Sequence, residues 1–337
     1  MNMNRINWGQ CNNSAVYSGL IMCLVFALPI SADIKIALSS TMDPKTSGTY
    51  VWAQAFAAEL EKNGIHSAIF ASSSLGNEVV RAEQVLLGLL EINVCGTQEI
   101  DPFSDMIAAL ELPFIFEGSE EIDRLMLETD FLRKVNESST PYGIRVVDVV
   151  FMGGKTGLFT ARKPIRRLAD VKSFRMRAMM SEQVDYFEAW GGVATQVAWE
   201  EVPQALQTGI VDGYMNPPIV AVLFGHGGQL DYFTDIQMTP SVRVISVSER
   251  WYQNLASDER AVVEQAFIVA RKANREWTSL SEKRELQLLA EVGIEVIKIS
   301  PASRDEFRQK LLPLYTKQAS SETLDAITNY LQFLRMM

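Results

Sequence analysis

The sequence predicts an α/β fold made of two lobes, with a long helix near the C-terminus that bridges them. Three observations support this prediction. Short apolar runs alternate with helical patterns, the length of 337 residues suits two domains, and residues 258–291 contain neither proline nor glycine. At 1.5 Å per residue, a helix of that length would span on the order of 50 Å, which is more than one domain layer.

The start of the folded region alternates strands and helices. Strands are predicted at 34–38, 65–71 and 91–95, because each is a short apolar run bounded by turn residues. A helix lies between the first two, with Trp52, Phe56 and Leu60 spaced for one buried face. The next helix, 77–90, is predicted to point Val80, Val85 and Leu89 inward. This spacing favours parallel crossover connections.

The rest of the chain is richer in strands until the long helix begins. Further strands are predicted at 145–152, 157–161, 174–178, 194–197, 211–214 and 242–247. In the long helix, the expected apolar face comprises Val263, Phe267, Ala270, Ala273, Trp277 and Leu280. We find no flexible linker, so the chain is expected to cross between the lobes more than once. Lobe 1 is predicted to contain 33–154 plus about 243–275, and lobe 2 to contain 155–242 plus about 276–337.

Residues 1–32 are predicted to be a secretory signal peptide. Arg5 is followed by the apolar stretch 16–30 and then by the small pair Ser31-Ala32. The alternative is an uncleaved membrane anchor, but the apolar stretch is shorter than the roughly 20 residues that span a bilayer. The mature protein is therefore expected in the periplasm, with no direct membrane insertion after cleavage.

The composition argues against several classes of function. A net charge of −10 disfavours nucleic acid as a partner, because the surface repels phosphate. With 2 His and 3 Cys, the chain has no recognisable zinc motif. The nucleophile motif GxSxG and the dinucleotide motif GxGxxG are absent, and Val149 stands where a phosphate-binding loop ending at Gly154-Lys155-Thr156 needs glycine. We therefore expect no metal, no cofactor and no catalytic residues.

Candidate ligand-binding residues gather between 170 and 218. Arg175 and Arg177 stand in an otherwise apolar strand. Trp199 opens a helix, and Asn216 follows the next strand. We consider Arg177, Trp199 and Asn216 the candidates. All three fall at or beyond strand ends, where open α/β sheets bind ligands. Tyr214 is a candidate for the site or for the core. Ser40, after the first strand, and Thr97, after the third, are further candidates on the same argument.

An ordered set of motifs resembles the DctP-like substrate-binding subunits of tripartite ATP-independent periplasmic (TRAP) transporters. Ser73-Ser74-Leu75-Gly76-Asn77 is similar to a turn of that family, and Leu112-Pro113-Phe114 to its LP(F/Y) segment. Residues 168–177 resemble its segment around a conserved strand arginine. Residues 199–213 are similar to its W-x-E-V-x-x-A-L-Q-x-G-x-V-D-G pattern, which Asn216-Pro217 completes.

The resemblance implies two lobes that close on a small organic acid. It implies that Arg177 holds the ligand carboxylate through two hydrogen bonds, which suits the planar guanidinium fork. It also implies that Asn216 lines the pocket and that Trp199 stacks on the ligand. Many relatives carry a second basic residue where Gly157 stands here. Lys155 or Arg243 could replace it, or the ligand could carry a single carboxylate.

The predicted function is that of a periplasmic solute-binding protein without enzymatic activity. It would capture a small carboxylate and deliver it to the membrane subunits of a TRAP transporter. The alternatives are a secreted two-lobed enzyme that acts on a small organic acid, or a binding subunit for a sensor or another permease.

Overall fold

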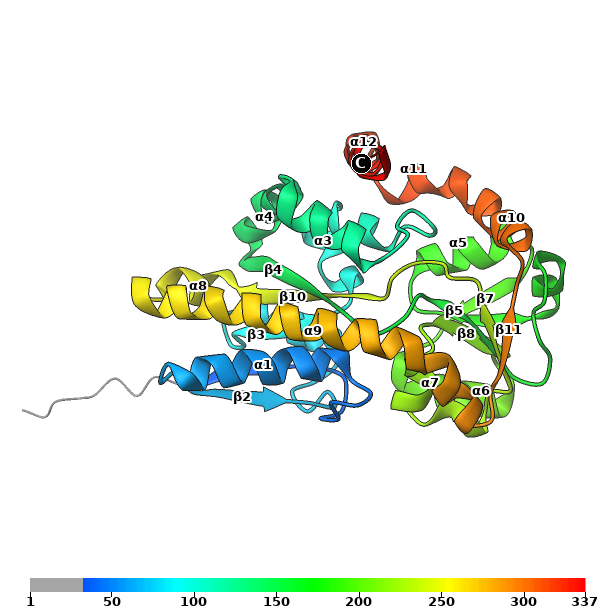
Figure 1. Cartoon of the computed structure of the whole chain (residues 1–337), viewed down its shortest axis with the longest axis horizontal. Helices are drawn as coiled ribbons and strands as arrows, with labels where there is room; N and C mark the ends of the chain where they lie inside the picture. The colour runs from blue at the N-terminus through cyan, green and yellow to red at the C-terminus, as the bar shows by residue number, and fades with distance from the viewer. Residues whose placement is uncertain (1–32, 337) are drawn as a thin grey trace, which may run out of the picture. The chain divides into compact units, whose positions relative to one another are not determined.

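The computed structural model describes residues 33–336, so the predicted signal peptide lies outside the described residues. The described chain contains two mixed sheets (Figure 1). The first has the strand order β2-β1-β3-β10-β4. Its strands are β1 (Ile34–Ala37), β2 (Ser67–Phe70), β3 (Ile92–Cys95), β4 (Ile144–Phe151) and β10 (Val242–Ser248). Strand β1 pairs in parallel with β2 and β3, whereas β10 runs antiparallel to both β3 and β4.

The second sheet has the order β11-β9-β5-β8-β6-β7. Its strands are β5 (Gly157–Thr160), β6 (Arg175–Ala178), β7 (Val193–Gln196), β8 (Gly213–Asn216), β9 (Tyr232–Asp235) and β11 (Glu295–Lys298). Strand β6 is parallel to β7 and β8, while β5 is antiparallel to β8 and β9. The sequence patterns did not predict β9 and β11, which pair in parallel at one edge of this sheet.

Helices pack around both sheets. The α-helices are α1 (Gly48–Lys62), α2 (Glu78–Leu86), α3 (Ser119–Glu128), α4 (Phe131–Ser139), α5 (Ser181–Ala189), α6 (Val202–Thr208), α7 (Ile219–Leu223), α8 (Glu249–Asn254), α9 (Ser257–Glu291), α10 (Pro301–Leu311), α11 (Tyr315–Gln318) and α12 (Ser321–Met336). The long helix α9 confirms the prediction from the uninterrupted run. It packs against β4 of the first sheet and the neighbouring helix α1, and also against β11 of the second sheet and helix α7 (Figure 1).

The core on one side of the first sheet is built around α1 and α9. Trp52, Phe56 and Leu60 of α1 are fully buried, as their spacing predicts. The rings of Trp52, Phe56 and Phe267 stack, with centroids 4.9–6.1 Å apart. Aromatic stacking with this much buried area fixes α9 on the first sheet.

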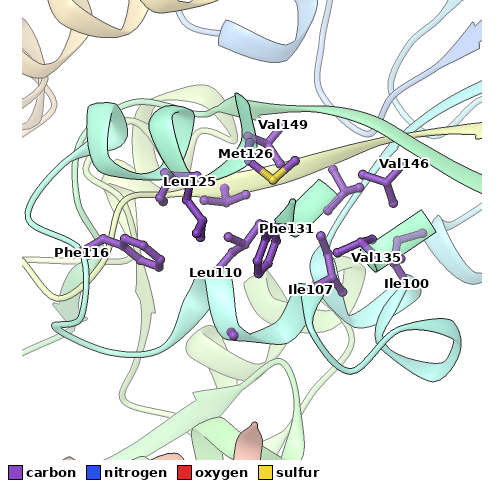
Figure 2. Packing of buried hydrophobic residues seen from close by; sticks show 14 of the residues in the cluster. Ile100, Ile107, Leu110, Phe116, Leu125, Met126, Phe131, Val135, Val146 and Val149 are labelled. Atoms are coloured by element: carbon purple, nitrogen blue, oxygen red, sulfur yellow. The ribbon is translucent and has the colours of Figure 1, made fainter. Parts of the chain in front are cut away.

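The other side of the same sheet has its own core (Figure 2). Phe116, Leu125, Met126 and Phe131 from the α3 and α4 region point toward β4 there. The apolar residues of α12 also join this core, including Ile327, Leu331 and Leu334. Residues 276–337 are predicted to belong to lobe 2, and the last helix of this range, α12, packs on the core of the first sheet. The reason is that the chain returns to α3 after α11.

Two predicted helix faces differ from the structure. In α2, Val85 is buried, but Val80 and Leu89 are 41% and 60% exposed. The helix ends at Leu86, and its inner face carries the fully buried Arg81 instead. In α9, Val263, Phe267 and Ala270 are buried as predicted, whereas Leu280 is 64% exposed.

The buried face of α9 continues through polar side chains in its second half. These are Asn274, Thr278, Ser281 and Glu285. Asn274 donates to the carbonyl oxygens of Gly48 and Phe151 at 3.0 Å, and it accepts from the Phe151 amide. A search for apolar periodicity could not detect this face, because its residues are buried to hydrogen-bond the backbone.

Candidate ligand-binding site

A cavity of about 400 Å³ is lined by residues of both sheets and their connections. Ser40, Glu78 and Arg243 contribute from the first sheet and its helix α2, and Arg177 and Asn216 contribute from the second sheet. Several of these residues lie where parallel strands end, which is the usual ligand position in open α/β sheets. The volume is within the range of about 300–1,000 Å³ typical of small-molecule sites.

Arg177 is the most buried cation in the wall of this cavity. The residue is only 3% exposed, and its Nε donates to the Val197 carbonyl oxygen at 2.9 Å. Within residues 33–336, its guanidinium has no ion pair and no other hydrogen bond. Burial lowers the pKa of Arg177 to about 10, because desolvation disfavours the charged form, so the group is still protonated at neutral pH. It is a desolvated charge without an ion-pair partner in the part of the chain that the structure describes.

Trp199 forms an aromatic wall of the cavity. It lies in the 3-10 turn η6 (Trp199–Glu201), and its ring centroid is 4.9 Å from that of Phe224, which also lines the cavity. The Cζ atom of Arg177 is 5.6 Å from the Trp199 ring centroid. Asn216, the last residue of β8, lies opposite Gly157 of β5 in the sheet register and also lines the cavity. The structure therefore brings Arg177, Trp199 and Asn216 together, as the sequence predicts.

Tyr214 does not line the cavity. It is fully buried, and its hydroxyl lies 3.0 Å from Nδ1 of His226. The ring of Trp199 packs edge-on against it, with centroids 5.8 Å apart. Of the two roles that the sequence left open for Tyr214, the structure favours the core.

Ser40 and Thr97 line two different cavities that are neighbours. Ser40 lines the first, but its hydroxyl is already bonded to Thr49 and Ser47, both at 2.7 Å. Thr97 lines a second cavity of about 100 Å³ that shares Gln98, Met152, Met179, Asn216 and Arg243 with the first. A ligand in the first cavity would therefore have the second beside it.

The second cavity is acidic. Asp101, Glu111 and Glu182 line it together with Tyr186 and Gln318. Burial raises the pKa of Glu111 to about 7, and the nearby Glu182 adds to this shift. The wall of this cavity contains these three carboxylates and the Arg243 guanidinium, whereas the wall of the first cavity also contains Arg177.

Arg243 lines both cavities, but it has a carboxylate partner. Its guanidinium forms an ion pair with Glu78, the first residue of α2. Burial by itself would raise the pKa of Glu78, but Arg243, the Ser39 hydroxyl and Arg81 together hold it below its ordinary value. Glu78 is therefore ionised, and its charge balances that of Arg243.

Lys155 lines neither cavity, contrary to the possibility raised from the sequence. Its Nζ lies 3.8 Å from Glu117, and its side chain is 21% exposed. Burial lowers the pKa of Lys155, and Glu117 partly opposes this effect. The residue stands in the connection between β4 and β5, before the strand that would aim it at the cavity.

Sequence reasoning missed most of the other residues that line the first cavity, among them Glu78, Glu99, Glu200 and Phe224. A signal existed for Glu78, because it directly follows the Ser-x-Leu-Gly-Asn turn and opens a helix whose next turn carries Arg81. No local pattern marks Glu99 or Phe224.

Two general findings hold for residues 33–336. No helix there combines the length and apolar character needed to cross a membrane. The same residues contain no group of three or more His, Cys, Asp or Glu side chains arranged to hold a metal ion.

Known proteins share this architecture. The chain is 25% identical over 263 residues to the sialic acid-binding periplasmic protein of Vibrio cholerae, which covers 76% of this chain and 79% of that protein. A TRAP periplasmic solute-binding protein from a Sulfitobacter species, solved with bound β-D-galacturonate, superposes with a TM-score of 0.80 at 23% identity and covers 89% of this chain and 99% of its own. A relative from Shewanella oneidensis with bound succinate has the same TM-score and coverage at 18% identity.

These structures show the two-lobed fold. The sequence profile described as "Bacterial extracellular solute-binding protein, family 7" (DctP) matches residues 38–322. Because this match spans most of the chain and includes the motifs around Arg177 and Asn216, the protein belongs to the DctP family of bacterial extracellular solute-binding proteins.

Proposed function

We propose that this protein binds a small organic acid in the first cavity and delivers it to the membrane subunits of a TRAP transporter. One observation carries the proposal. Arg177 is a buried guanidinium without a carboxylate partner among residues 33–336, and it lines a cavity large enough for a small acid. A buried charge is stabilised only when it is paired, so a ligand carboxylate supplies the missing partner.

Five residues that line the cavity have distinct roles in this proposal. The free edge of the Arg177 guanidinium forms two charge-assisted hydrogen bonds with the carboxylate, because its Nε is already used by Val197. Asn216, at the end of β8, donates a further hydrogen bond. Trp199 covers the carbon skeleton, and Ser40 and Arg243 complete the wall on the side of the first sheet.

Ligand exchange would involve the connections between the sheets. We propose that lobe 1 contains the first sheet with α12 and that lobe 2 contains the second sheet. The lobes would close on the acid around the β4–β5 and β9–β10 connections and α9. We further propose that residues 1–32 direct export to the periplasm and that the protein has no enzymatic activity, consistent with a family of binding proteins. Nothing in the cavity favours the alternative of a secreted enzyme.

The test is calorimetric titration with acids selected by a thermal-shift screen of mono- and dicarboxylates. Arg177→Ala should weaken binding by on the order of 2–5 kcal/mol, which is roughly 30- to 5,000-fold in Kd. Arg177→Lys should also bind poorly, because it keeps the charge and loses the fork.

Arg175→Ala is the matched control, since Arg175 lies two residues away, is exposed, and pairs with Asp212 at 3.1 Å. It should change affinity little. Near wild-type affinity in a folded Arg177→Ala protein would refute the proposed carboxylate anchor.

A further inference from the structure

The two guanidinium groups in the wall of the first cavity differ in whether a carboxylate balances their charge. Arg177 has no carboxylate within ion-pair distance among residues 33–336, whereas Arg243 is paired with Glu78. The side chains of Arg243 and Glu78 are each 17% exposed, so water screens their attraction only partly. A ligand therefore meets one unpaired cation and one neutralised cation.

Glu78 is held firmly in its position. The Ser39 hydroxyl donates to its Oε1 at 2.8 Å, and the Gly96 amide donates to its Oε2 at 3.1 Å. Gln98 Nε2 lies 3.4 Å from the same Oε2. Glu78 is also the first residue of α2, where the helix dipole favours a negative charge. With both oxygens occupied by fixed donors, the carboxylate cannot swing away when a ligand enters.

Glu78 also forms an ion pair with a second arginine behind the cavity wall. Arg81 is fully buried, and its NH2 lies 3.8 Å from Glu78 Oε1. Glu99 also lines the cavity, and its pKa is raised by burial and then by Glu78. When Glu99 is ionised, two arginines, Arg81 and Arg243, face two carboxylates, Glu78 and Glu99. This part of the wall then presents no net positive charge to a ligand.

We propose that Glu78 determines specificity: by neutralising Arg243, it restricts the cavity to monocarboxylates and excludes a second carboxylate. This inference rests on the proposed function, in which Arg177 binds the first carboxylate. A second ionised carboxylate at Arg243 would have to displace Glu78 or lie beside it, and like charges in a poorly hydrated site repel strongly.

Apart from Glu200, the remaining polar wall suits neutral groups on the same ligand. Uncharged hydrogen-bonding side chains line the cavity near Glu78 and Arg177; they are Ser39, Ser40, Thr49, Ser73, Asn77, Gln98, Gln196 and Asn216. Amides and hydroxyls of this kind can donate to and accept from ligand hydroxyl groups. The ligand class that follows is a hydroxylated acid with one carboxylate.

The experiment compares matched acids that differ in one carboxylate. The probes are D-galacturonate with galactarate, D-gluconate with D-glucarate, and butyrate with succinate, titrated by calorimetry into the full-length mature chain. The wild type should bind a hydroxylated monocarboxylate at least about tenfold more tightly than its dicarboxylate partner. Glu78→Gln is nearly isosteric and releases the charge of Arg243, so it should reduce this preference by about tenfold or more.

Two further variants separate the role of Glu78 from general effects. Glu78→Gln/Arg243→Gln removes both charges and should restore the preference for the monocarboxylate. Glu249→Gln disrupts a comparable ion pair, in which Glu249 binds Arg145. The side chain of Glu249 is also 17% exposed, and neither residue lines a cavity. This variant should leave the preference unchanged.

Each outcome bears on the inference. A wild type that prefers the dicarboxylates, or that binds none of the six compounds, overturns the assigned ligand class. An unchanged preference in Glu78→Gln overturns the role of Glu78. If Glu78→Gln does not fold, the inference is still tested by the preference for monocarboxylates in the wild type and in the double variant. Loss of binding in Arg177→Ala together with an unchanged preference in Glu78→Gln would refute this inference alone and leave the carboxylate anchor intact.

Discussion

Glu285 is a buried carboxyl group whose ionisation should make the stability of the protein depend on pH. It is 1% exposed and lies on α9 against the connection between β4 and β5. Its oxygens accept from the Gly154 amide at 3.0 and 2.9 Å, and the Ser281 hydroxyl donates to it at 2.7 Å. Among residues 33–336, no cation lies within ion-pair distance of it. Burial therefore raises the pKa of Glu285 to about 7.

The sign of the effect follows from proton binding. Because the ordinary pKa of a glutamate is 4.5, the folded state holds this proton more tightly than the unfolded chain does. The stabilisation is complete below about pH 4.5 and is lost as the pH rises through about 7. The pKa difference of about 7 − 4.5 = 2.5 corresponds to about 3 kcal/mol.

The perturbation is Glu285→Gln, which keeps a hydrogen-bond acceptor and cannot ionise. Urea unfolding at several values between pH 4.5 and 8 should show the variant gaining about 3 kcal/mol relative to the wild type across this range. Glu276→Gln removes an exposed carboxyl from the same helix and controls for the loss of one charge. A stability difference between Glu285→Gln and wild type that is the same at every pH would refute the reasoning.

Two further predictions concern the site and the second sheet. Trp199→Ala should weaken binding of the selected acid by roughly tenfold, because an aromatic contact and its buried area are lost. The ligand should change the tryptophan fluorescence of the wild type but not that of the variant. Equal affinities of the two proteins would contradict a contact between Trp199 and the ligand. Gly213→Ala should destabilise the protein by about 3 kcal/mol in thermal unfolding, since a Cβ there would lie 1.9 Å from the Phe159 carbonyl oxygen. Gly118→Ala is its control, because a Cβ at Gly118 meets no atom within 4 Å, and equal effects of the two changes would count against this explanation.

Local sequence patterns determined the secondary structure and the family. Period-two and helical spacings located most strands of both sheets, and the run without proline or glycine located α9. These signals are local, because each depends on residues within one or two turns. The motifs around Arg177, Trp199 and Asn216 indicated the family correctly, and these three residues line one cavity.

The tertiary structure decided which side chains are buried and which charges remain unpaired. Glu78 and Arg243 are 165 residues apart, so no sequence window could show that one neutralises the other. Arg81 and Glu285 occupy inner helix faces that apolar periodicity assigns to hydrophobic residues, because hydrogen bonds and ion pairs compensate their burial. The ring contact between Trp199, in the segment after β7, and Tyr214 of β8 joins two separate elements. Such long-range pairings depend on the packing of the whole fold. The sequence by itself therefore determined the class of protein, whereas the structure was needed to show that Arg177 has no carboxylate partner among residues 33–336.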